Sequence, residues 1–422
     1  MKVSVVGLGY IGLPTAALIA SHGVEVVGFD VNQNTVDTIN NGKIHILEPG
    51  LDIAVQKSIN AGFLRATISL EKSDIFIIAV PTPLKGDKEP DLSYVESAFE
   101  AIAPLLEKGN VVILESTVPV GTTEKMSELM QDLRSDLYFP KFNVVGADSD
   151  ISVAHCPERV LPGQIMRELV ENDRVIGGIT RSCAERTQNL YNIFIEGNCL
   201  ITDCRTAELS KLVENAFRDV NIAFANELSL ICEKLKMNVW DLIKLANLHP
   251  RVDILQPGPG VGGHCIAVDP WFIINSSPDE AKLIHTARLV NDSKPQFVLK
   301  QVNRAVVALK KKRKELNIAC LGLSFKPNID DLRESPALSI ALQISLMGFS
   351  KQYIVEPNIK KIPNEFDKDL VELVSIETAI TKSDILVLLV DHEQFKKINQ
   401  DFLLGKQVID TRGVLNEVKD KF

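Results

Sequence analysis

Residues 2–30, KVSVVGLGYIGLPTAALIASHGVEVVGFD, decide the fold of the N-terminal part of the chain. Two short valine-rich runs flank a helix-compatible segment, and Gly7, Gly9 and Gly12 stand between the first run and that segment. Glycines at this GxGxxG spacing permit a tight turn and let the backbone approach a pyrophosphate at the start of the helix. The stretch therefore predicts a strand–helix–strand unit that binds a dinucleotide.

Asp30 ends the second valine-rich run. A carboxylate at this strand end hydrogen-bonds a ribose hydroxyl and repels a 2′-phosphate, so we expect NAD rather than NADP. Tyr10 and Ile11 lie within the glycine-rich turn and are assigned to the same cofactor site. The alternative is that the glycines serve only the turn and that Asp30 is an ordinary capping residue.

The composition is that of a globular protein. The chain has 422 residues, of which 45% are hydrophobic and 24% charged, and its net charge is −9. An acidic chain offers no counter-charge to a nucleic-acid backbone, so we expect no nucleic-acid partner. Any phosphate must be bound by local groups.

Seven cysteines are scattered along the chain without a CxxC pair. This spacing predicts neither a disulfide framework nor a metal site, and it favours a reducing cytoplasm. The N-terminal apolar stretch lacks a small-residue cleavage site, and no apolar run reaches the ~18–20 residues that span a bilayer. We therefore expect a soluble cytoplasmic protein without membrane insertion.

Buried strand patterns alternate with helical ones at both ends of the chain. Continuous apolar runs at 2–9, 24–30, 74–80, 109–117 and 172–178 indicate parallel strands that are buried on both faces. Residues 206–237 have helical periodicity without Gly or Pro and predict one long helix. We therefore predict two Rossmann-like parallel-sheet domains, 1–200 and 301–422, joined by a central helical domain, 201–300.

Small hydroxyl residues follow two of the predicted strands. Thr82 stands in AVPTP, and Ser116 and Thr117 stand in ESTVPVGT. The ligand crevice of an open α/β sheet lies along this carboxyl edge, so these residues are candidates for cofactor or water contacts. Each is equally well explained as a turn or cap residue.

The segment 257–270, PGPGVGGHCIAVDP, is too rich in Gly and Pro for a helix or a regular strand. Its backbone amides can line a ligand, and Cys265 stands near its end. Free cysteines are usually inert core residues, and we expect that of the other six. We expect Cys265 to be reactive.

On the predicted long helix, Glu208, Lys211, Asn215, Asp219 and Asn226 share one face. Two interpretations stay open. The stripe is a solvated face, or Lys211 and Asn215 form a donor pair that stabilises an oxyanion or a thiolate near Cys265.

Basic residues recur in the loops. Arg159 lies with Glu158 in CPERVLPG, Lys326 and Arg333 lie in FKPNIDDLRESP, and Arg412 lies in DTRG. An acidic chain needs such side chains to bind a diphosphate. The alternative is that they are ordinary surface residues without a binding role.

Seven motifs occur in an order that resembles the UDP-glucose/GDP-mannose dehydrogenase family over essentially the whole chain. They are GLGYIGLP, STVPVGT, CPERVLPG, the helix 208–228, GVGGHC, FKPNIDDLRESP and DTRG. Segments 80–91 and 249–272 look most like the branch that acts on UDP-N-acetyl-D-mannosamine. The UDP-glucose branch usually has Lys where Val268 precedes Asp269, which argues against UDP-glucose.

The resemblance implies oxidation of a primary alcohol to a carboxylate with two NAD⁺. Cys265 would be the nucleophile that captures the aldehyde and passes through a thioester. Lys211 and Asn215 would stabilise developing negative charge. Asp269 and Glu158 would position water or move protons, and Thr117 would help to order that water.

The resemblance also implies the binding residues. Those for the UDP-sugar are Arg159, Leu161, Lys211, Asn215, Arg251, Gly262, Lys326 and Arg412. Arg333 is placed with NAD, together with Gly7, Gly9, Tyr10, Ile11, Gly12, Asp30, Thr82 and Thr117. We expect a homodimer in which Arg251 reaches the partner's pocket and the long helix forms the contact. No metal is expected.

Three alternatives stay open. The same chemistry on UDP-N-acetylglucosamine or UDP-glucose is the nearest. A two-electron hydroxy-acid dehydrogenase shares the N-terminal unit but needs neither Cys265 nor a second α/β domain, and it would release one NADH. A non-catalytic nucleotide sensor would show no turnover.

Overall fold

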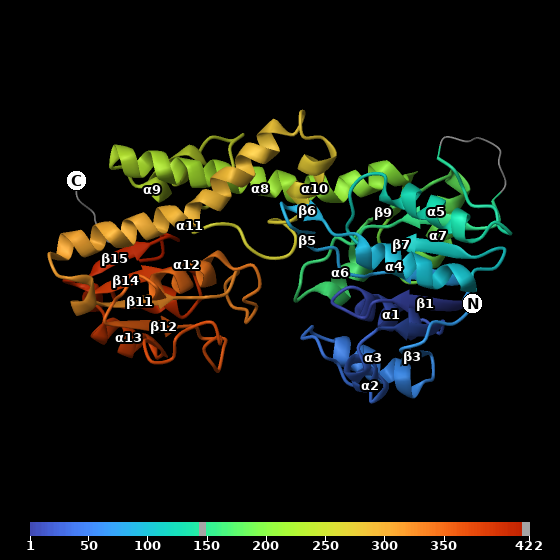
Figure 1. Ribbon diagram of the computed structural model, residues 1–422, viewed down its shortest axis with the longest axis horizontal. Coiled ribbons are helices and arrows are strands. Elements are labelled where there is room, and N and C mark those ends of the chain that lie inside the picture. The colour runs from blue at the N-terminus through green and yellow to red at the C-terminus, as the bar shows by residue number, and fades with distance from the viewer. Residues whose placement is uncertain (143–148, 416–422) are drawn as a thin grey trace. The chain divides into compact units, whose positions relative to one another are not determined.

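The computed structural model describes residues 1–142 and 149–415. The chain divides into two compact units. The first comprises Met1–Glu214 and Trp271–Pro278, and the second comprises Asn215–Pro270 and the chain from Asp279 onward. Figure 1 labels their helices and strands.

The first unit contains an eight-stranded sheet in the order β10-β9-β8-β7-β4-β1-β2-β3. Its strands are β1 Lys2–Val6, β2 Glu25–Phe29, β3 Leu64–Thr67, β4 Ile75–Ile78, β7 Val111–Leu114, β8 Ser152–His155, β9 Arg174–Gly178 and β10 Cys199–Asp203. The strands from β8 to β3 all run parallel. Valine and isoleucine dominate β1, β4 and β7 because both faces of the sheet are covered.

The expectation of a parallel strand at 172–178 is wrong in direction. β9 pairs antiparallel with β8 and parallel with β10. An apolar run indicates burial on both faces, but it carries no information about strand direction.

Helices pack on both faces of this sheet. They are α1 Gly12–Ser21, α2 Gln33–Asn40, α3 Leu51–Asn60, α4 Ser93–Ile102, α5 Thr122–Leu133, α6 Ile165–Glu171 and α7 Arg181–Tyr191, with a 3-10 turn η1 at Ala103–Leu105 and a hairpin of β5 Leu84–Lys85 and β6 Glu89–Pro90. One core includes Leu13 of α1 and Leu51 of α3, and a separate core includes Phe99 of α4 and Met126 of α5. The carboxyl strand ends stay available for ligands.

The predicted long helix is α8, Cys204–Leu235, which confirms the helix expected over 206–237. The boundary between the two units falls within α8 and again within α10, Asp269–Ser276. Along the described ranges 1–142 and 149–415, no helix is both long and apolar enough to cross a membrane.

The second unit contains a five-stranded parallel sheet in the order β13-β12-β11-β14-β15. The strands are β11 Asn317–Leu321, β12 Lys351–Val355, β13 Val371–Leu373, β14 Ile385–Leu388 and β15 Gln407–Asp410. The helices are α9 Val239–Ala246, α11 Lys282–Leu309, α12 Pro336–Ser345 and α13 Ile376–Lys382, with 3-10 turns η2 Arg313–Glu315, η3 Phe395–Lys397 and η4 Gln400–Leu403.

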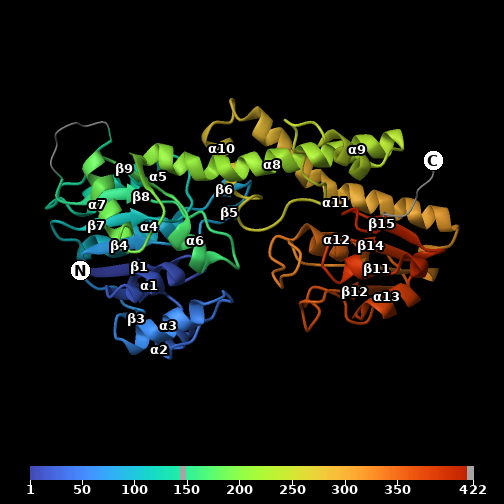
Figure 2. The same ribbon diagram turned by 180° about the vertical axis from the view of Figure 1, so that it is seen from behind.

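Figure 2 shows α12 and α13 on opposite sides of this second sheet. One core joins Val302 of α11 and Ile340 of α12 to the sheet, and a second core joins Ala379 of α13 to the other face. The sheet is therefore buried on both faces, as its continuous apolar runs predict.

Candidate functional site

In the glycine-rich turn, the fold itself requires glycine at positions 7 and 12 but not at position 9. Gly7 has φ +92°, and a Cβ there would lie 2.7 Å from the carbonyl oxygen of Ala79. A Cβ on Gly12 would collide with the carbonyl oxygen of Gly7. By contrast, nothing lies within 4 Å of a Cβ built on Gly9. The turn thus leaves open space before α1, where a pyrophosphate fits.

Asp30 stands at the carboxyl end of β2. Its Oδ2 accepts a hydrogen bond from Leu8 N at 3.0 Å, and its Oδ1 accepts one from Asn32 N at 2.9 Å. The carboxylate therefore braces the glycine-rich turn, and it has lone pairs left for a ribose hydroxyl. Tyr10 is 40% exposed and Ile11 is half-buried in the same turn. These features fit a bound dinucleotide.

The hydroxyl residues after β4 and β7 differ in their contacts. Ser116 is buried, and its Oγ donates to the carbonyl of Val80 at 2.7 Å, so it ties the two strand ends together. Thr82 and Thr117 are half-buried at the same strand ends. For Ser116, this hydrogen bond between the strand ends is a sufficient explanation, and no cofactor or water contact is needed.

Glu158 is buried after β8 and forms an ion pair with Arg174 of β9. The main chain of Arg159 donates to Glu158 Oε1 at 2.7 Å, and the guanidinium of Arg159 donates to Glu214 at 2.8 Å. Leu161, farther along this loop, is 39% exposed. Arg174 is not among the residues predicted from the sequence, although a lone arginine inside an apolar strand is a visible signal of a buried charge.

Glu115, at the end of β7, was also missed. It accepts a hydrogen bond from the hydroxyl of the buried Tyr191 at 2.7 Å. Burial raises the pKa of Glu115 to about 7, although the nearby Arg174 opposes the shift. A carboxyl group that titrates near neutrality therefore lies beneath the carboxyl edge of the first sheet.

In the second unit, the glycines of the loop 257–263 allow close approach to the C-terminal sheet. A Cβ on Gly258 would lie 2.5 Å from a guanidinium nitrogen of Arg412, and a Cβ on Gly260 would lie 2.9 Å from Pro336. A Cβ on Gly262 would collide with the carbonyl of Glu334. The backbone of the loop that leads to Cys265 therefore packs closely against segments that are predicted to bind the substrate.

Three of the predicted catalytic residues are joined by hydrogen bonds. Cys265 is exposed, and its carbonyl accepts from the main chain of Asp269 at 2.8 Å. Asp269 is buried at the first position of α10, and its Oδ2 accepts from the side chain of Asn215 at 2.6 Å. Of the other cysteines, five are buried and Cys199 is intermediate, as expected for packing residues.

The predicted basic residues of the second unit lie in loops. Lys326 is exposed after β11, and Arg251 is exposed beyond α9. Arg412, after β15, donates to Asp391 at 2.7 Å, and Arg333 pairs with Asp331 at 2.7 Å. A cavity of about 30 Å³ is lined by Arg412 together with Gly260, Ser324, Phe325, Pro336 and Asp391. The structure thus gathers Arg412, the glycine loop and the loop of Lys326.

The interpretation of the polar stripe on α8 as a solvated face is wrong. Glu208, Asn215, Asp219 and Asn226 are all buried, and Lys211 is half-buried. Asp219 pairs with Arg288 of α11 at 2.6 Å, and Asn226 donates to Asn291 of α11 at 2.8 Å. The polar residues of this stripe therefore form hydrogen bonds and ion pairs in the interior. Their partners on α11 lie more than sixty residues away in the sequence.

Within the part of the chain that the structure describes, no group of three or more His, Cys, Asp or Glu side chains is placed to hold a metal ion.

Comparison with known proteins identifies three models of one family along the chain. The UDP-glucose/GDP-mannose dehydrogenase family matches through its NAD binding domain over residues 1–195, its central domain over 205–293 and its UDP binding domain over 319–417.

Relatives match along nearly their whole length. The chain is 58% identical to an NDP-N-acetyl-D-galactosaminuronic acid dehydrogenase of Ralstonia nicotianae, over 98% of this chain and 96% of that one. It is also 58% identical to a UDP-N-acetyl-D-mannosamine dehydrogenase of Escherichia coli, over 98% of each. The solved structure of a UDP-D-ManNAc dehydrogenase from Pyrococcus horikoshii is 39% identical, with a TM-score of 0.88 over 100% of this chain and 98% of that one.

Proposed function

Because the chain belongs to the UDP-glucose/GDP-mannose dehydrogenase family, we propose that it oxidises carbon six of UDP-N-acetyl-D-mannosamine to a carboxylate in two NAD-dependent steps. The observation that carries the proposal is the exposed Cys265 at the end of the glycine loop, hydrogen-bonded through its main chain to the buried Asp269.

The chain is divided by function into three parts. Residues 1–200 bind NAD, residues 201–300 provide catalysis and dimerisation, and residues 301–422 bind the UDP-sugar.

The first oxidation turns the alcohol into an aldehyde. NAD⁺, which the glycine-rich turn and Asp30 would hold, would supply the hydride acceptor for each oxidation. Lys211 and Asn215, one turn apart on α8, donate to the oxygen that becomes negative as its proton leaves. Asp269 and Glu158 position the water or move the protons that the two oxidations release, and Thr117 helps to order that water.

Cys265 makes the second oxidation feasible. Its thiolate adds to the aldehyde carbon and forms a C–S bond, and protonation of the oxygen gives a thiohemiacetal. This adduct again carries a C–H bond that can lose a hydride, and the product is a thioester. Water then attacks the thioester carbon, the C–S bond breaks, and the carboxylate and the Cys265 thiol are released.

The remaining assignments follow the resemblance to the family. Cofactor contacts are assigned to Gly7, Gly9, Tyr10, Ile11, Gly12, Asp30, Thr82, Thr117 and Arg333. Substrate contacts are assigned to Arg159, Leu161, Lys211, Asn215, Arg251, Gly262, Lys326 and Arg412. The reaction belongs in the cytoplasm, where a reducing environment preserves the Cys265 thiol, and its product serves bacterial surface polysaccharide synthesis.

The active form is a homodimer to which α8 contributes. Phe217, Phe224, Ile231 and Leu235 of α8 are 68%, 55%, 44% and 60% exposed. Their spacing places them on one face of the helix, and so large an apolar stripe is typical of a protein interface. Arg251, in an exposed loop of the same unit, is assigned to the partner's pocket.

The experiment is a substrate panel with full-length protein. UDP-N-acetylmannosamine, UDP-N-acetylgalactosamine, UDP-N-acetylglucosamine, UDP-glucose and GDP-mannose are each incubated with NAD⁺, and NADH and sugar product are counted. We expect two NADH per UDP-N-acetylmannosamine and a uronic acid product. Because of the Ralstonia relative, UDP-N-acetylgalactosamine is the second candidate substrate. Preferential turnover of this compound would favour it over UDP-N-acetylmannosamine.

The mechanism is tested with Cys265→Ser and, as a matched control, Cys199→Ser. The Cys265 variant is expected to stop after partial oxidation, because a serine hydroxyl is a far weaker nucleophile at neutral pH. The Cys199 variant is expected to keep full turnover. Complete acid production by Cys265→Ser would refute the thioester route.

A further inference from the structure

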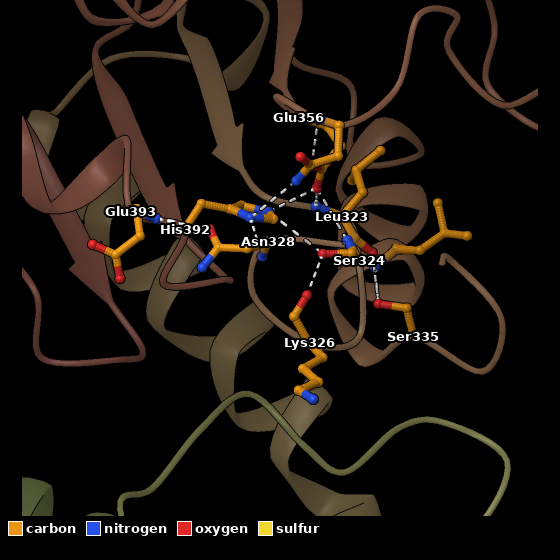
Figure 3. Close-up of polar contacts among 10 residues, drawn as sticks. Leu323, Ser324, Lys326, Asn328, Ser335, Glu356, His392 and Glu393 are labelled. Carbon is orange, nitrogen blue, oxygen red and sulfur yellow. Dashed lines mark hydrogen bonds and ion pairs between the residues drawn. The ribbon is translucent and has the colours of Figure 1, made fainter. Parts of the chain in front are cut away.

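A carboxylate and an imidazole are buried together at the carboxyl edge of the second sheet. Glu356 follows β12 and His392 lies beyond β14, and neither side chain has any exposed surface. His392 Nε2 lies 3.0 Å from Glu356 Oε2. Figure 3 shows the pair between the loop after β11 and the loop that carries Glu393.

The contacts of His392 fix its tautomer. The main-chain N–H of Asn328 points at Nδ1 across 2.9 Å, so Nδ1 must carry a lone pair. The proton of the neutral ring is then on Nε2 and is donated to Glu356. His392 therefore acts as an acceptor toward the loop after β11 and as a donor toward the carboxylate.

The same pair holds both ends of the segment 323–328. Glu356 Oε2 accepts from Leu323 N at 2.7 Å and from Ser324 N at 3.1 Å. At the other end, His392 accepts from Asn328, whose φ of +64° lies in the left-handed region that Asn adopts more readily than most residues. Two anchored ends around four residues leave this loop little freedom.

Lys326 lies in the middle of the anchored segment. Its carbonyl accepts from Ser324 Oγ at 2.8 Å, and that hydroxyl lies 3.4 Å from His392 Nε2. In Figure 3 the carbonyl of Lys326 faces the cluster, whereas its side chain extends away from it. The backbone of Lys326 is thus fixed by the buried pair while its ammonium group stays available.

Glu356 keeps its charge despite its burial. Burial alone would raise its pKa, but the hydrogen bonds from His392 and from the main chain of Leu323 outweigh that effect and lower the pKa. The ionised carboxylate in turn holds the proton of His392 on Nε2, which leaves Nδ1 as the acceptor.

We infer that His392 is a positioning residue for the substrate: seated on Glu356, it holds the 323–328 loop so that Lys326 can meet the diphosphate of the UDP-sugar. The inference rests on the proposed function, because it takes Lys326 as a substrate contact. His392 acts through the main chain of Asn328 and does not itself touch the substrate. Its loss should therefore weaken nucleotide binding and leave the oxidation chemistry in place.

Two substitutions at one position separate its two hydrogen bonds. In His392→Asn the amide oxygen can occupy the place of Nδ1 and accept from Asn328, whereas in His392→Gln the amide nitrogen can occupy the place of Nε2 and reach only Glu356. Asp384→Asn is the control, because Asp384 accepts from Asn317 N at 2.9 Å at the start of β11, the opposite end of the sheet. All variants are made in the full-length chain.

Binding of UDP and of NAD⁺ is measured by calorimetry, and KM and kcat are measured with the turned-over UDP-sugar. We expect His392→Gln to raise the Kd for UDP and the KM about tenfold, the effect of losing one well-placed contact. We expect kcat and the Kd for NAD⁺ to change less than about threefold, His392→Asn to recover most of the UDP affinity, and Asp384→Asn to bind UDP normally.

A double-mutant cycle with Lys326→Met tests the route of action. If His392 acts through Lys326, the combined variant binds UDP about as weakly as Lys326→Met alone. Additive losses would overturn the inference, as would normal UDP affinity in His392→Gln or equal losses in the Asn and Gln variants.

A measurement on the unmodified protein covers the case in which the variants fail to fold. Nitrogen-15 spectra of the histidine rings should show the tautomer that carries its proton on Nε2. The His392 signal is assigned by its absence from any one folded His392 variant or by selective labelling. A ring protonated on Nδ1 would overturn the inference. Failure of the wild-type chain to bind UDP would refute the proposed function as well, whereas UDP binding that is independent of His392 would refute this inference alone.

Discussion

Asn215 donates its side-chain amide to Asp269 across 2.6 Å, and both residues are more than nine-tenths buried. The bond joins α8 to the first residue of α10, directly after the loop of Cys265. A buried carboxylate needs such a donor, because an uncompensated charge in the interior is costly.

Asn215→Asp should therefore disrupt the site. The change removes the donor and sets a second carboxylate against the first, which costs about 2–3 kcal/mol. We expect the melting temperature to fall by about 5–10 °C at pH 7 and activity to fall at least tenfold. Asn221→Asp, on the same helix, is the control, and an equal loss in both variants would contradict the argument.

The two glycines of the dinucleotide turn should respond oppositely to alanine. In Gly7→Ala the new methyl group would clash with the carbonyl of Ala79, and alanine would have to adopt a φ of +92°. The resulting strain of about 1–3 kcal/mol should lower the melting temperature by several degrees. Gly9→Ala should melt like the wild type, yet raise the Kd for NAD⁺ at least about tenfold, because its methyl group takes the space of the pyrophosphate. Unchanged NAD⁺ affinity in a folded Gly9→Ala would remove Gly9 from the cofactor site.

Glu115 should make the first unit less stable as pH rises. Its folded pKa of about 7 exceeds its ordinary value of 4.5, so the stability that its proton contributes is complete below pH 4.5 and is lost by about pH 7. Glu115→Gln should match the wild type near pH 5 and be more stable by up to about 3 kcal/mol at pH 8. Thermal melts from pH 5 to pH 8 check this, with the exposed Glu128→Gln as the control; parallel profiles would show that Glu115 ionises normally.

The apolar face of α8 predicts a dimer that one charge can break. Phe217 is 68% exposed, and Phe217→Asp would place a carboxylate in the proposed contact. Light scattering after gel filtration should show a dimer for the wild type and a monomer for the variant at micromolar concentration. Arg218→Asp, on an exposed side of the same helix away from the stripe, should stay dimeric. A monomeric wild-type chain would refute the proposed assembly.

Much of the fold follows from local signals in the sequence. The valine-rich runs predict β1 and β2 because strands covered on both faces have no polar alternation. The uninterrupted periodicity of 206–237 predicts α8 for a similar reason. The direction of β9 could not be predicted, because it depends on the path of the chain between β8 and β9 and not on the residues of the strand itself.

The site was less accessible to sequence reasoning. Cys265 and Asp269 stand in a distinctive glycine-rich segment, whereas His392 stands in a common-looking loop. Its role emerges only when β11, β12 and β14 bring Ser324, Glu356 and His392 together. The polarity of Asp219 was visible, but its partner Arg288 belongs to another helix, so burial could not be distinguished from solvation.

The glycine loop 257–263 has a consequence for directed evolution. Where the loop meets Pro336 and the main chain of Glu334, even a methyl group at Gly260 or Gly262 would approach the neighbouring atoms too closely. Random mutagenesis would find few tolerated replacements there. A change of sugar preference would have to be selected on side chains elsewhere around the proposed pocket, while the segment leading to Cys265 stays nearly invariant.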